Sequence, residues 1–263
     1  MKLISRFHLA TPCAVNVPLS IVMQVAVVFW LHPAAAAAQE NPTIRVAVAA
    51  NFRAPFEALR EQFTTTTGTR IDVIYGSSGL LYAQIRQGAP YDAFLSADAA
   101  RPAALHQAAL TPGDPIRYAT GRLALWMPGQ IARPEQLRMT RFALANPLLA
   151  PYGLAARQCL ETMSLWQAVS HNAVYGSNVS QTFQFVSSTG VAAGFVALAQ
   201  LQATGIALAD IWLVPQDCHE PIEQHAVALN DSAATSEFLK FLLSIETQAA
   251  IAAMGYASTS VSR

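Results

Sequence analysis

Val46-Ala47-Val48-Ala49-Ala50-Asn51-Phe52 and Gly76-Ser77-Ser78-Gly79 are the two stretches that decide how this chain is interpreted. Each ends an apolar run typical of a buried strand and precedes apolar residues at helical spacing. A strand that stops where a helix begins leaves backbone N–H groups unpaired, and the positive end of the helix dipole points at the same place. Two such junctions close together predict an anion site that needs neither lysine nor arginine.

The strand and helix patterns around these junctions alternate as βαβαβ. The strands are expected at Ile44 to Ala49, Arg70 to Tyr75 and Asp92 to Leu95. The first intervening helix carries Phe56, Leu59 and Phe63, and the second carries Leu81 and Ile85. This order predicts a parallel sheet that is covered by helices on both faces.

The pattern restarts after a Pro- and Gly-rich break at residues 111–115. A long apolar strand, Tyr118 to Met127, is expected to cross into a second α/β lobe, and Glu223 to Leu229 is expected to cross back. The predicted fold is therefore two Rossmann-like lobes joined by a two-strand hinge, with a ligand in the cleft between them. The expected division is residues 1–38 as signal peptide, 39–119 plus 226–263 as lobe I, and 120–225 as lobe II.

The second lobe offers two more junctions. Ala150-Pro151-Tyr152-Gly153 follows the expected strand at residues 142–145, and Asn178-Val179 follows the one at residues 173–175. Tyr152 has a phenol to donate, whereas Val179 has only its backbone N–H. Taken singly, Asn51 and Asn178 are consistent with ordinary helix caps and Ser77-Ser78 with a polar turn, and a lone Tyr152 is consistent with a tyrosine packed at the lobe surface. The site interpretation gains from the pairing of Asn51 with Gly76-Ser77-Ser78-Gly79.

Composition and charge exclude several classes of function. The chain has 263 residues, of which 16 are basic, 16 are acidic and 53% are hydrophobic. No basic block alternates with aromatic residues, so nucleic acid is not expected as a partner. No G-x-S-x-G elbow, P-loop or metal-ligand spacing is present, which predicts that the protein is not an enzyme and carries no metal or organic cofactor.

The N-terminus has the three parts of a secretory signal peptide. Lys2 and Arg6 precede an apolar run at residues 21–31, and the alanines of residues 34–38 supply the cleavage site. The product is expected in the periplasm. An oxidising compartment permits a bridge between Cys159 and Cys218, but the sequence does not bring them within reach, so we do not predict a disulfide.

Several motifs together resemble a known family. They run in family order as Val-Ala-Ala-Asn-Phe, Gly-Ser-Ser-Gly-Leu-Leu-Tyr-Ala-Gln-Ile, Gly-Ala-Pro-Tyr-Asp-Ala-Phe-Leu-Ser-Ala-Asp, Ala-Asn-Pro with Ala-Pro-Tyr-Gly-Leu-Ala, Gly-Phe-Val-Ala-Leu-Ala-Gln and Glu-Pro-Ile-Glu-Gln-His-Ala-Val. Over about residues 43 to 258 the chain resembles the periplasmic molybdate-binding proteins of ABC transporters, which have the type II periplasmic binding protein fold.

The resemblance implies a hinge-closing protein that binds molybdate or tungstate through neutral hydrogen-bond donors. The implied contacts with the oxyanion are Asn51, Ser78, Tyr152 and the backbone of Val179, with the N–H of Ala50 beside them. They bind the oxyanion and are not direct ligands of the metal atom. Because relatives place serine or threonine where this chain has Ala50, we expect Asn51 to supply the side-chain donor there.

The implied partners are the oxyanion and the membrane permease of an ABC transporter, and we expect a monomer. Three alternatives are open at this point. The same fold could bind another oxyanion, with sulfate first. An exported hydrolase or transferase would need a nucleophile and a base that the sequence does not pair, and a sensor module would bind molybdate but signal through a protein partner.

Overall fold

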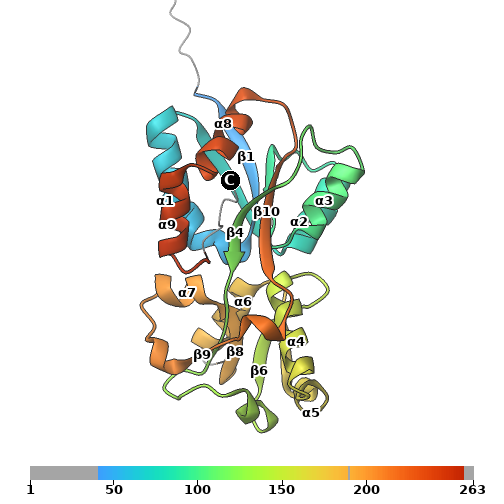
Figure 1. Cartoon of the computed structure of the whole chain (residues 1–263), viewed down its shortest axis with the longest axis vertical. Coiled ribbons are helices and arrows are strands. Elements are labelled where there is room, and N and C mark those ends of the chain that lie inside the picture. The colour runs from blue at the N-terminus through green and yellow to red at the C-terminus, as the bar shows by residue number, and fades with distance from the viewer. Residues whose placement is uncertain (1–40, 189, 258–263) are drawn as a thin grey trace, which may run out of the picture. The chain divides into compact units, whose positions relative to one another are not determined.

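The structure is a computed structural model that describes residues 41–188 and 190–257. The signal peptide expected at residues 1–38 lies outside the described residues. Within the described part, the strands form two five-stranded sheets (Figure 1). The strands of the first sheet, in spatial order, are β2 (Arg70–Gly76), β1 (Thr43–Ala49), β3 (Ala93–Leu95), β10 (Ile222–Ala228) and β4 (Ile116–Gly121).

The second sheet repeats the plan of the first. Its strands, in spatial order, are β7 (Ala173–Gly176), β6 (Phe142–Ala145), β8 (Ala193–Ala197), β5 (Leu123–Trp126) and β9 (Ile211–Leu213). In each sheet the first three strands are parallel and the fourth is antiparallel, namely β10 or β5. The sheets are thus mixed, where we expected them to be parallel. The two antiparallel strands enter from the other lobe and not through a crossover helix, so no crossover forces them to run parallel.

Helices cover both sheets. In lobe I they are α1 (Arg53–Thr67), α2 (Ser78–Arg86), α3 (Ala100–Gln107), α8 (Ala233–Leu242) and α9 (Ile245–Ala253), with the 3₁₀ turn η1 (Ala50–Phe52) before α1. In lobe II they are α4 (Pro151–Thr162), α5 (Trp166–Val169), α6 (Val179–Ser187) and α7 (Leu198–Ala203), with short 3₁₀ turns η2 (Pro134–Arg138), η3 (Ser170–Asn172), η4 (Leu208–Asp210) and η5 (Gln216–Cys218).

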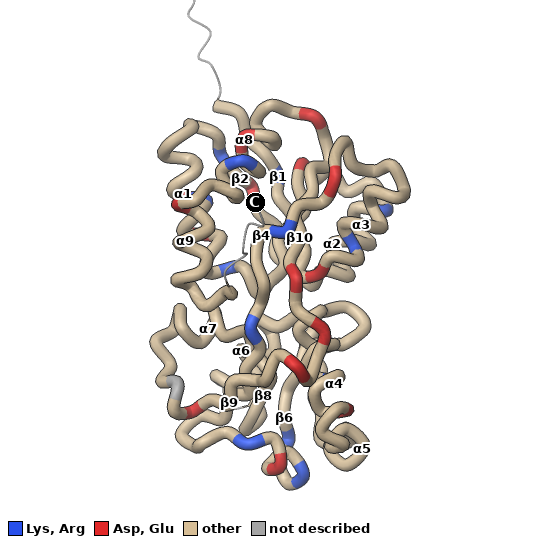
Figure 2. Tube along the Cα trace, in the orientation of Figure 1, with Lys and Arg blue, Asp and Glu red and all other residues tan. Residues whose placement is uncertain are grey.

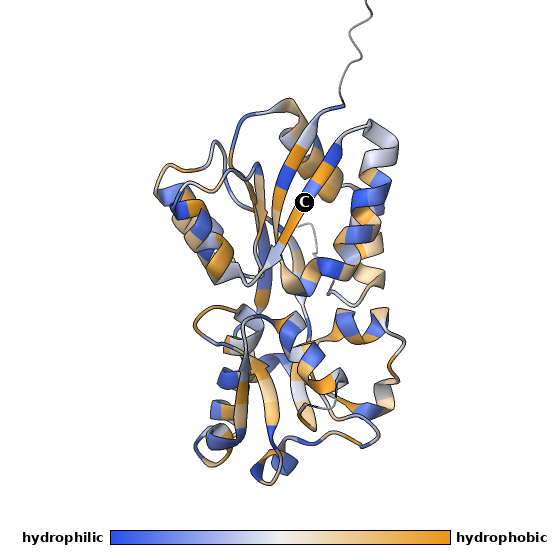
Figure 3. Cartoon of the chain, turned by 180° about the vertical axis from the view of Figure 1, so that it is seen from behind, coloured by the Kyte–Doolittle hydropathy of each residue, from blue (hydrophilic) through white to orange (hydrophobic). Residues whose placement is uncertain are grey.

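The core of each lobe forms where apolar helix faces meet the sheet. Helix α1 shows the pattern, because it buries Phe56, Leu59 and Phe63 at the predicted helical spacing. It ends at Gly68, whose φ of 75° is the left-handed conformation that glycine adopts at helix ends. Figure 3 shows the same alternation of hydropathy along the helices and strands of both lobes.

The crossing between lobes differs in detail from the expected one. The expected strand Tyr118 to Met127 is divided at Arg122, with β4 in the first sheet and β5 in the second. Strand β10, expected to cross back, pairs only with β3 and β4 of the first sheet. The expected boundaries at 119/120 and 225/226 fall inside β4 and β10, and the division of the chain into domains at these points stays a prediction.

A disulfide joins Cys159 of α4 to Cys218 of η5, with a Cα–Cα separation of 4.6 Å. We did not predict this bridge. The two cysteines are 59 residues apart in sequence, and only the packing of α4 against η5 brings them together. A hydrogen bond of 3.1 Å from Thr162 Oγ1 to the carbonyl oxygen of Cys218 belongs to the same contact.

Charged residues are scattered along the described chain and do not gather in one block (Figure 2). No helix in residues 41–188 and 190–257 is long and apolar enough to cross a membrane.

Candidate functional site

The four predicted junctions meet around one small cavity. Strands β1 and β2 are neighbours in the first sheet, and β6 and β7 hold the equivalent places in the second. The cavity is lined by residues that end or follow these four strands, together with Ala97 after β3. The lining residues are Ala49, Ala50, Asn51, Gly76, Ser77, Ser78, Ala97, Ala150, Pro151, Tyr152, Asn178 and Val179. All five residues expected to contact a ligand are among them.

Ser78 is the first residue of α2 and is buried. Its Oγ accepts a hydrogen bond of 2.9 Å from the N–H of Ala97. A hydroxyl that accepts in this way still has its own hydrogen to donate. The neighbouring Ser77 has a different role, because its Oγ accepts from the N–H of Leu80 and caps the helix. Both hydroxyls therefore keep a hydrogen to donate, and Ser78 is the one that the resemblance implies as an oxyanion contact.

Asn51 lies in η1, directly after β1, and is buried. Its Nδ2 donates to Gln224 Oε1 at 2.9 Å and to Tyr256 Oη at 3.1 Å. These two bonds use both hydrogens of the amide, so the side chain is not the spare donor that we expected. The backbone N–H groups of Ala50 and Asn51 begin a helical turn, where a helix cannot satisfy them. They are the donors that this junction offers.

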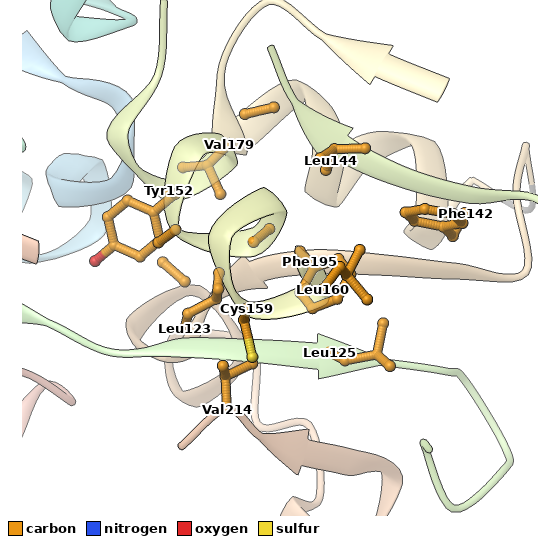
Figure 4. Close-up of a cluster of buried hydrophobic side chains, with 14 of the residues drawn as sticks. Leu123, Leu125, Phe142, Leu144, Tyr152, Cys159, Leu160, Val179, Phe195 and Val214 are labelled. Atoms are coloured by element: carbon orange, nitrogen blue, oxygen red, sulfur yellow. The ribbon is translucent and has the colours of Figure 1, made fainter. Parts of the chain in front are cut away.

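Tyr152 comes from lobe II, in the first turn of α4, where Pro151 takes the position that suits proline. Figure 4 shows its ring at the edge of an apolar cluster, with the phenol oxygen pointing out of that cluster. The oxygen accepts a hydrogen bond of 3.3 Å from Nε2 of Gln224 on strand β10. Burial raises the pKa of the Tyr152 phenol well above its usual range, so the group is a neutral donor.

Val179 is the first residue of α6, and the side chain of Asn178 caps this helix by accepting from the N–H of Gln181 at 3.0 Å. That cap leaves the N–H of Val179 itself without a helical acceptor. The next residue, Ser180, reaches the other lobe. Its Oγ donates to the carbonyl oxygen of Ala50 at 3.0 Å and accepts from Nε2 of Gln200 at 3.1 Å.

Direct contacts bring the two lobes together around the cavity. The N–H of Gly79 donates to the carbonyl oxygen of Leu149 at 2.9 Å. A Cβ atom at Gly79 would lie only 2.9 Å from that oxygen, so the close approach requires glycine. Arg101 Nη2 donates to the carbonyl oxygen of Leu148 at 3.2 Å. The lobes are therefore closed on each other at the site.

The site presents donors without formal charge. Among the described residues that line the cavity, none is charged. Arg101, which donates to Leu148, forms an ion pair with Asp98. Within the described chain, no group of three or more His, Cys, Asp and Glu side chains is placed to hold a metal ion. Helix starts and neutral hydroxyls favour an anion through oriented dipoles.

Sequence reasoning missed the residues behind the site, above all Gln224. A signal for Gln224 was present, because Ile222, Gln224 and Ala226 alternate on the buried face of β10. A polar side chain in the buried register of a strand needs hydrogen-bond partners. Its partners, however, lie 72 and 173 residues away in sequence, so the fold was needed to identify them.

Comparison with known proteins agrees with this geometry. Residues 44–257 match the family model of the bacterial extracellular solute-binding proteins. The chain belongs to this family.

Two curated members of this solute-binding family are named molybdate-binding protein ModA. The protein of Rhodobacter capsulatus is 36% identical over 219 residues, which cover 80% of this chain and 86% of that protein. The protein of Azotobacter vinelandii is 36% identical over 232 residues, which cover 84% of this chain and 92% of that protein.

Solved structures show the same fold. The periplasmic molybdate-binding protein of Azotobacter vinelandii matches with a TM-score of 0.76 and 35% identity, over 81% of this chain and 98% of that one. The sulfate-binding protein SubI of Mycobacterium tuberculosis H37Rv matches with a TM-score of 0.67, over 84% of this chain and 88% of that one. Its identity is 15%, so this second likeness concerns the fold alone.

A second, larger cavity lies beside the site, between α2, α3 and α4. Its lining is largely apolar but includes Asp98, Arg101 and Glu220. Asp98 there is paired with Arg101, and the carboxylate of Glu220 opposes an anion, whereas no carboxylate lines the small cavity. The small cavity, where the four predicted junctions meet, is therefore the candidate site, and its role as the ligand site stays a prediction.

Proposed function

We propose that this protein binds molybdate, with tungstate as a second ligand, and delivers it to the permease of an ABC transporter. The observation that carries the proposal is the cavity where four strand-to-helix junctions from both lobes meet and present neutral donors. The two relatives at 36% identity, both named molybdate-binding proteins, supply the identity of the oxyanion.

The geometry supports the ligand set that the resemblance implies. The N–H groups of Ala50 and Asn51 and the hydroxyl of Ser78 act from lobe I, and the phenol of Tyr152 and the N–H of Val179 act from lobe II. Charge-assisted hydrogen bonds from such donors are about twice as strong as neutral ones. A ligand that touches both lobes favours the closed form, because it gains all of its contacts only there.

The donor set also discriminates between oxyanions. Molybdate, tungstate and sulfate carry no proton near neutral pH, whereas phosphate carries one that needs an acceptor. The proposed ligands are hydroxyls and N–H groups, and no carboxylate is among them to accept a hydrogen bond from the proton of phosphate. Sulfate is not favoured, because the sulfate-binding protein SubI shares only 15% identity with this chain, far below the two molybdate-binding relatives.

The remaining parts of the proposal concern the setting. The relatives named above are binding proteins, and we propose that this chain likewise performs no catalysis and needs no cofactor apart from its oxyanion ligand. We propose that it works in the periplasm as a monomer, after removal of residues 1–38. The permease as partner rests on the resemblance to the binding proteins of ABC transporters.

Thermal melting of the mature protein with molybdate, tungstate, sulfate and phosphate tests the proposal. A ligand at a thousandfold its dissociation constant stabilises the folded state by about 4.1 kcal/mol. For a chain of this size, that raises the melting temperature by roughly 8–16 °C. We expect such a shift with molybdate and tungstate only. Equal shifts with sulfate would contradict the assigned ligand, and no shift with any oxyanion would contradict the site.

A further inference from the structure

Behind the cavity lies a buried group of polar side chains, here called the hinge cluster: Asn51, Tyr118, Tyr152, Gln224 and Tyr256. Each is at most 5% exposed. Four belong to lobe I and its hinge strands β4 and β10, and Tyr152 belongs to α4 of lobe II. Buried hydroxyls and amides need partners, so the direction of each hydrogen bond in this cluster matters.

The donor and acceptor of each hydrogen bond can be assigned from the backbone carbonyl oxygen of Asn51, because a carbonyl oxygen can only accept. Tyr256 Oη lies 3.0 Å from the backbone carbonyl oxygen of Asn51, so the Tyr256 hydroxyl must donate there. The Tyr256 oxygen is then an acceptor for its remaining neighbours, among them the Asn51 side-chain amide, which donates to it at 3.1 Å. This fixes Asn51 with its NH₂ group facing the cluster.

The orientation of Asn51 fixes that of Gln224. The same Asn51 Nδ2 lies 2.9 Å from the Gln224 amide, so the atom facing it must be the oxygen, Oε1. Tyr118 donates to this oxygen as well, at 2.9 Å. With Oε1 turned toward two donors, the Nε2 of Gln224 faces Tyr152 and donates to its phenol oxygen at 3.3 Å.

The consequence falls on Tyr152. Because its oxygen accepts from Gln224, its hydrogen must point elsewhere. Within the described chain the phenol has Tyr256 as a hydrogen-bond partner, and Tyr152 also lines the cavity where the oxyanion would lie. We propose that Gln224 is a positioning residue that orients the Tyr152 hydroxyl to donate to the bound oxyanion. This inference rests on the function proposed above.

The space around the two side chains supports this role. A Cβ atom at Gly121 would lie 2.3 Å from Tyr152 Oη and 3.0 Å from Gln224 Nε2. The phenol and the amide thus pack against bare backbone, and only a glycine at the end of β4 leaves room for them. As long as the Tyr152 ring packs against Gly121, its phenol oxygen stays next to the amide of Gln224.

A double-mutant cycle tests whether Gln224 acts through Tyr152. The variants are Gln224→Met, which removes both polar atoms, Tyr152→Phe, and the two together, each titrated with molybdate by calorimetry. Loss of a hydrogen bond to a charged ligand lowers affinity about 10- to 100-fold. We expect Tyr152→Phe to show this loss, Gln224→Met a smaller one, and the double variant no more than Tyr152→Phe alone. Losses that multiply would overturn the proposal.

Gln224→Glu is a second variant that keeps the acceptor for Asn51 and Tyr118 and therefore protects the fold. A carboxylate cannot donate, so it draws the Tyr152 hydrogen away from the oxyanion and also repels the dianion. We expect at least a tenfold loss of affinity at pH 8, with recovery on lowering the pH, since a protonated carboxyl can donate again. Gln84→Glu is the matched control, because Gln84 Oε1 also accepts from a tyrosine, Tyr91, but on the exposed side of α2.

The pH comparison is made against the wild type because other groups face the cluster. Burial raises the pKa of Tyr118 and Tyr256 above their usual range, so both stay neutral. His225, next to Gln224 on β10, has its pKa lowered by burial, and Asp98 lies near Tyr118 and His225. These groups are present in both proteins, so only a pH dependence specific to Gln224→Glu supports the inference.

The outcomes separate this inference from the proposed function. If the wild type fails to bind molybdate, the proposed function is wrong, and so is the inference that depends on it. If the wild type binds and Gln224→Glu binds equally well at pH 8, the proposed function stands and the positioning role of Gln224 is wrong.

Discussion

The two walls of the site are held in place by different means. In lobe I, side-chain hydrogen bonds within the lobe fix the donors, as between Ser78 and Ala97 or Asn51 and Gln224. In lobe II, a cap from Asn178 holds the start of α6, and a disulfide joins α4 to η5. Tyr152 is the exception, because a residue of the other lobe orients it. The comparison indicates that each wall is formed on its own, and that the Tyr152 donor is completed only when the lobes close.

The largest expected effect is the loss of stability when the disulfide of lobe II is removed. Cross-linking residues 59 positions apart stabilises the folded state by about 4 kcal/mol in the chain-entropy treatment. Cys159→Ser is therefore expected to lower the free energy of unfolding by about that amount, as measured by urea denaturation. Wild-type protein treated with a reductant is the control and should match the variant. Equal midpoints for oxidised wild type and variant would show that α4 does not depend on the bridge.

Two neighbouring serines sharpen the account of lobe I. Ser78→Ala removes a hydroxyl with a free hydrogen and should weaken molybdate binding about 10- to 100-fold, the cost of one hydrogen bond to a charged ligand. Ser77→Ala removes a helix cap that is not among the proposed ligands, and should cost about 1 kcal/mol of stability with little change in affinity. Calorimetric titration and thermal melting of both variants check this. The account of lobe I is wrong if Ser77→Ala lowers the affinity for molybdate and Ser78→Ala lowers only the stability.

A smaller effect is expected for the contact that joins the walls. Ser180→Ala removes the hydrogen bond to the carbonyl oxygen of Ala50 and should destabilise the closed form by about 1 kcal/mol. That corresponds to roughly a fivefold loss of molybdate affinity. Ser187→Ala on the same helix is the control, because its Oγ donates only within α6, to Gln184. An equal loss in both variants would mean that the helix, not the interlobe contact, matters.

The smallest effect is the response of binding to alkaline pH. Burial raises the pKa of Tyr152 and Tyr256, so neither becomes a phenolate that repels the dianion, and molybdate affinity should stay constant from pH 7 to about pH 9.5. In the unfolded chain these tyrosines ionise near pH 10. The free energy of unfolding should therefore be at its full value below that pH and fall above it. A loss of affinity between pH 8 and 9.5 would contradict the neutral donors.

The sequence predicted those parts of the site that depend on local pattern. The four junctions follow from strands that end in small polar residues, and Ser78, Tyr152 and Val179 lie around the cavity as expected. What the sequence did not reveal depends on contacts between distant residues. The amide of Asn51 donates to Gln224 and Tyr256, so the side chain that the resemblance gave to the ligand takes part in the support behind the site.

The fold shows the same limit. The order of strands and helices was predictable, because hydrophobic periodicity is a local signal. The antiparallel direction of β5 and β10 and the bridge between Cys159 and Cys218 were not, since both follow from how the chain returns from one lobe to the other. Packing of elements far apart in sequence decides such features.

The most direct test of the central claim is a crystal structure with molybdate, with the molybdenum located by its anomalous scattering. We predict one peak in the small cavity, within hydrogen-bonding reach, through the oxyanion, of the N–H groups of Ala50, Asn51 and Val179 and the hydroxyls of Ser78 and Tyr152. A peak in the larger cavity beside Arg101, or none in the small one, would contradict the account.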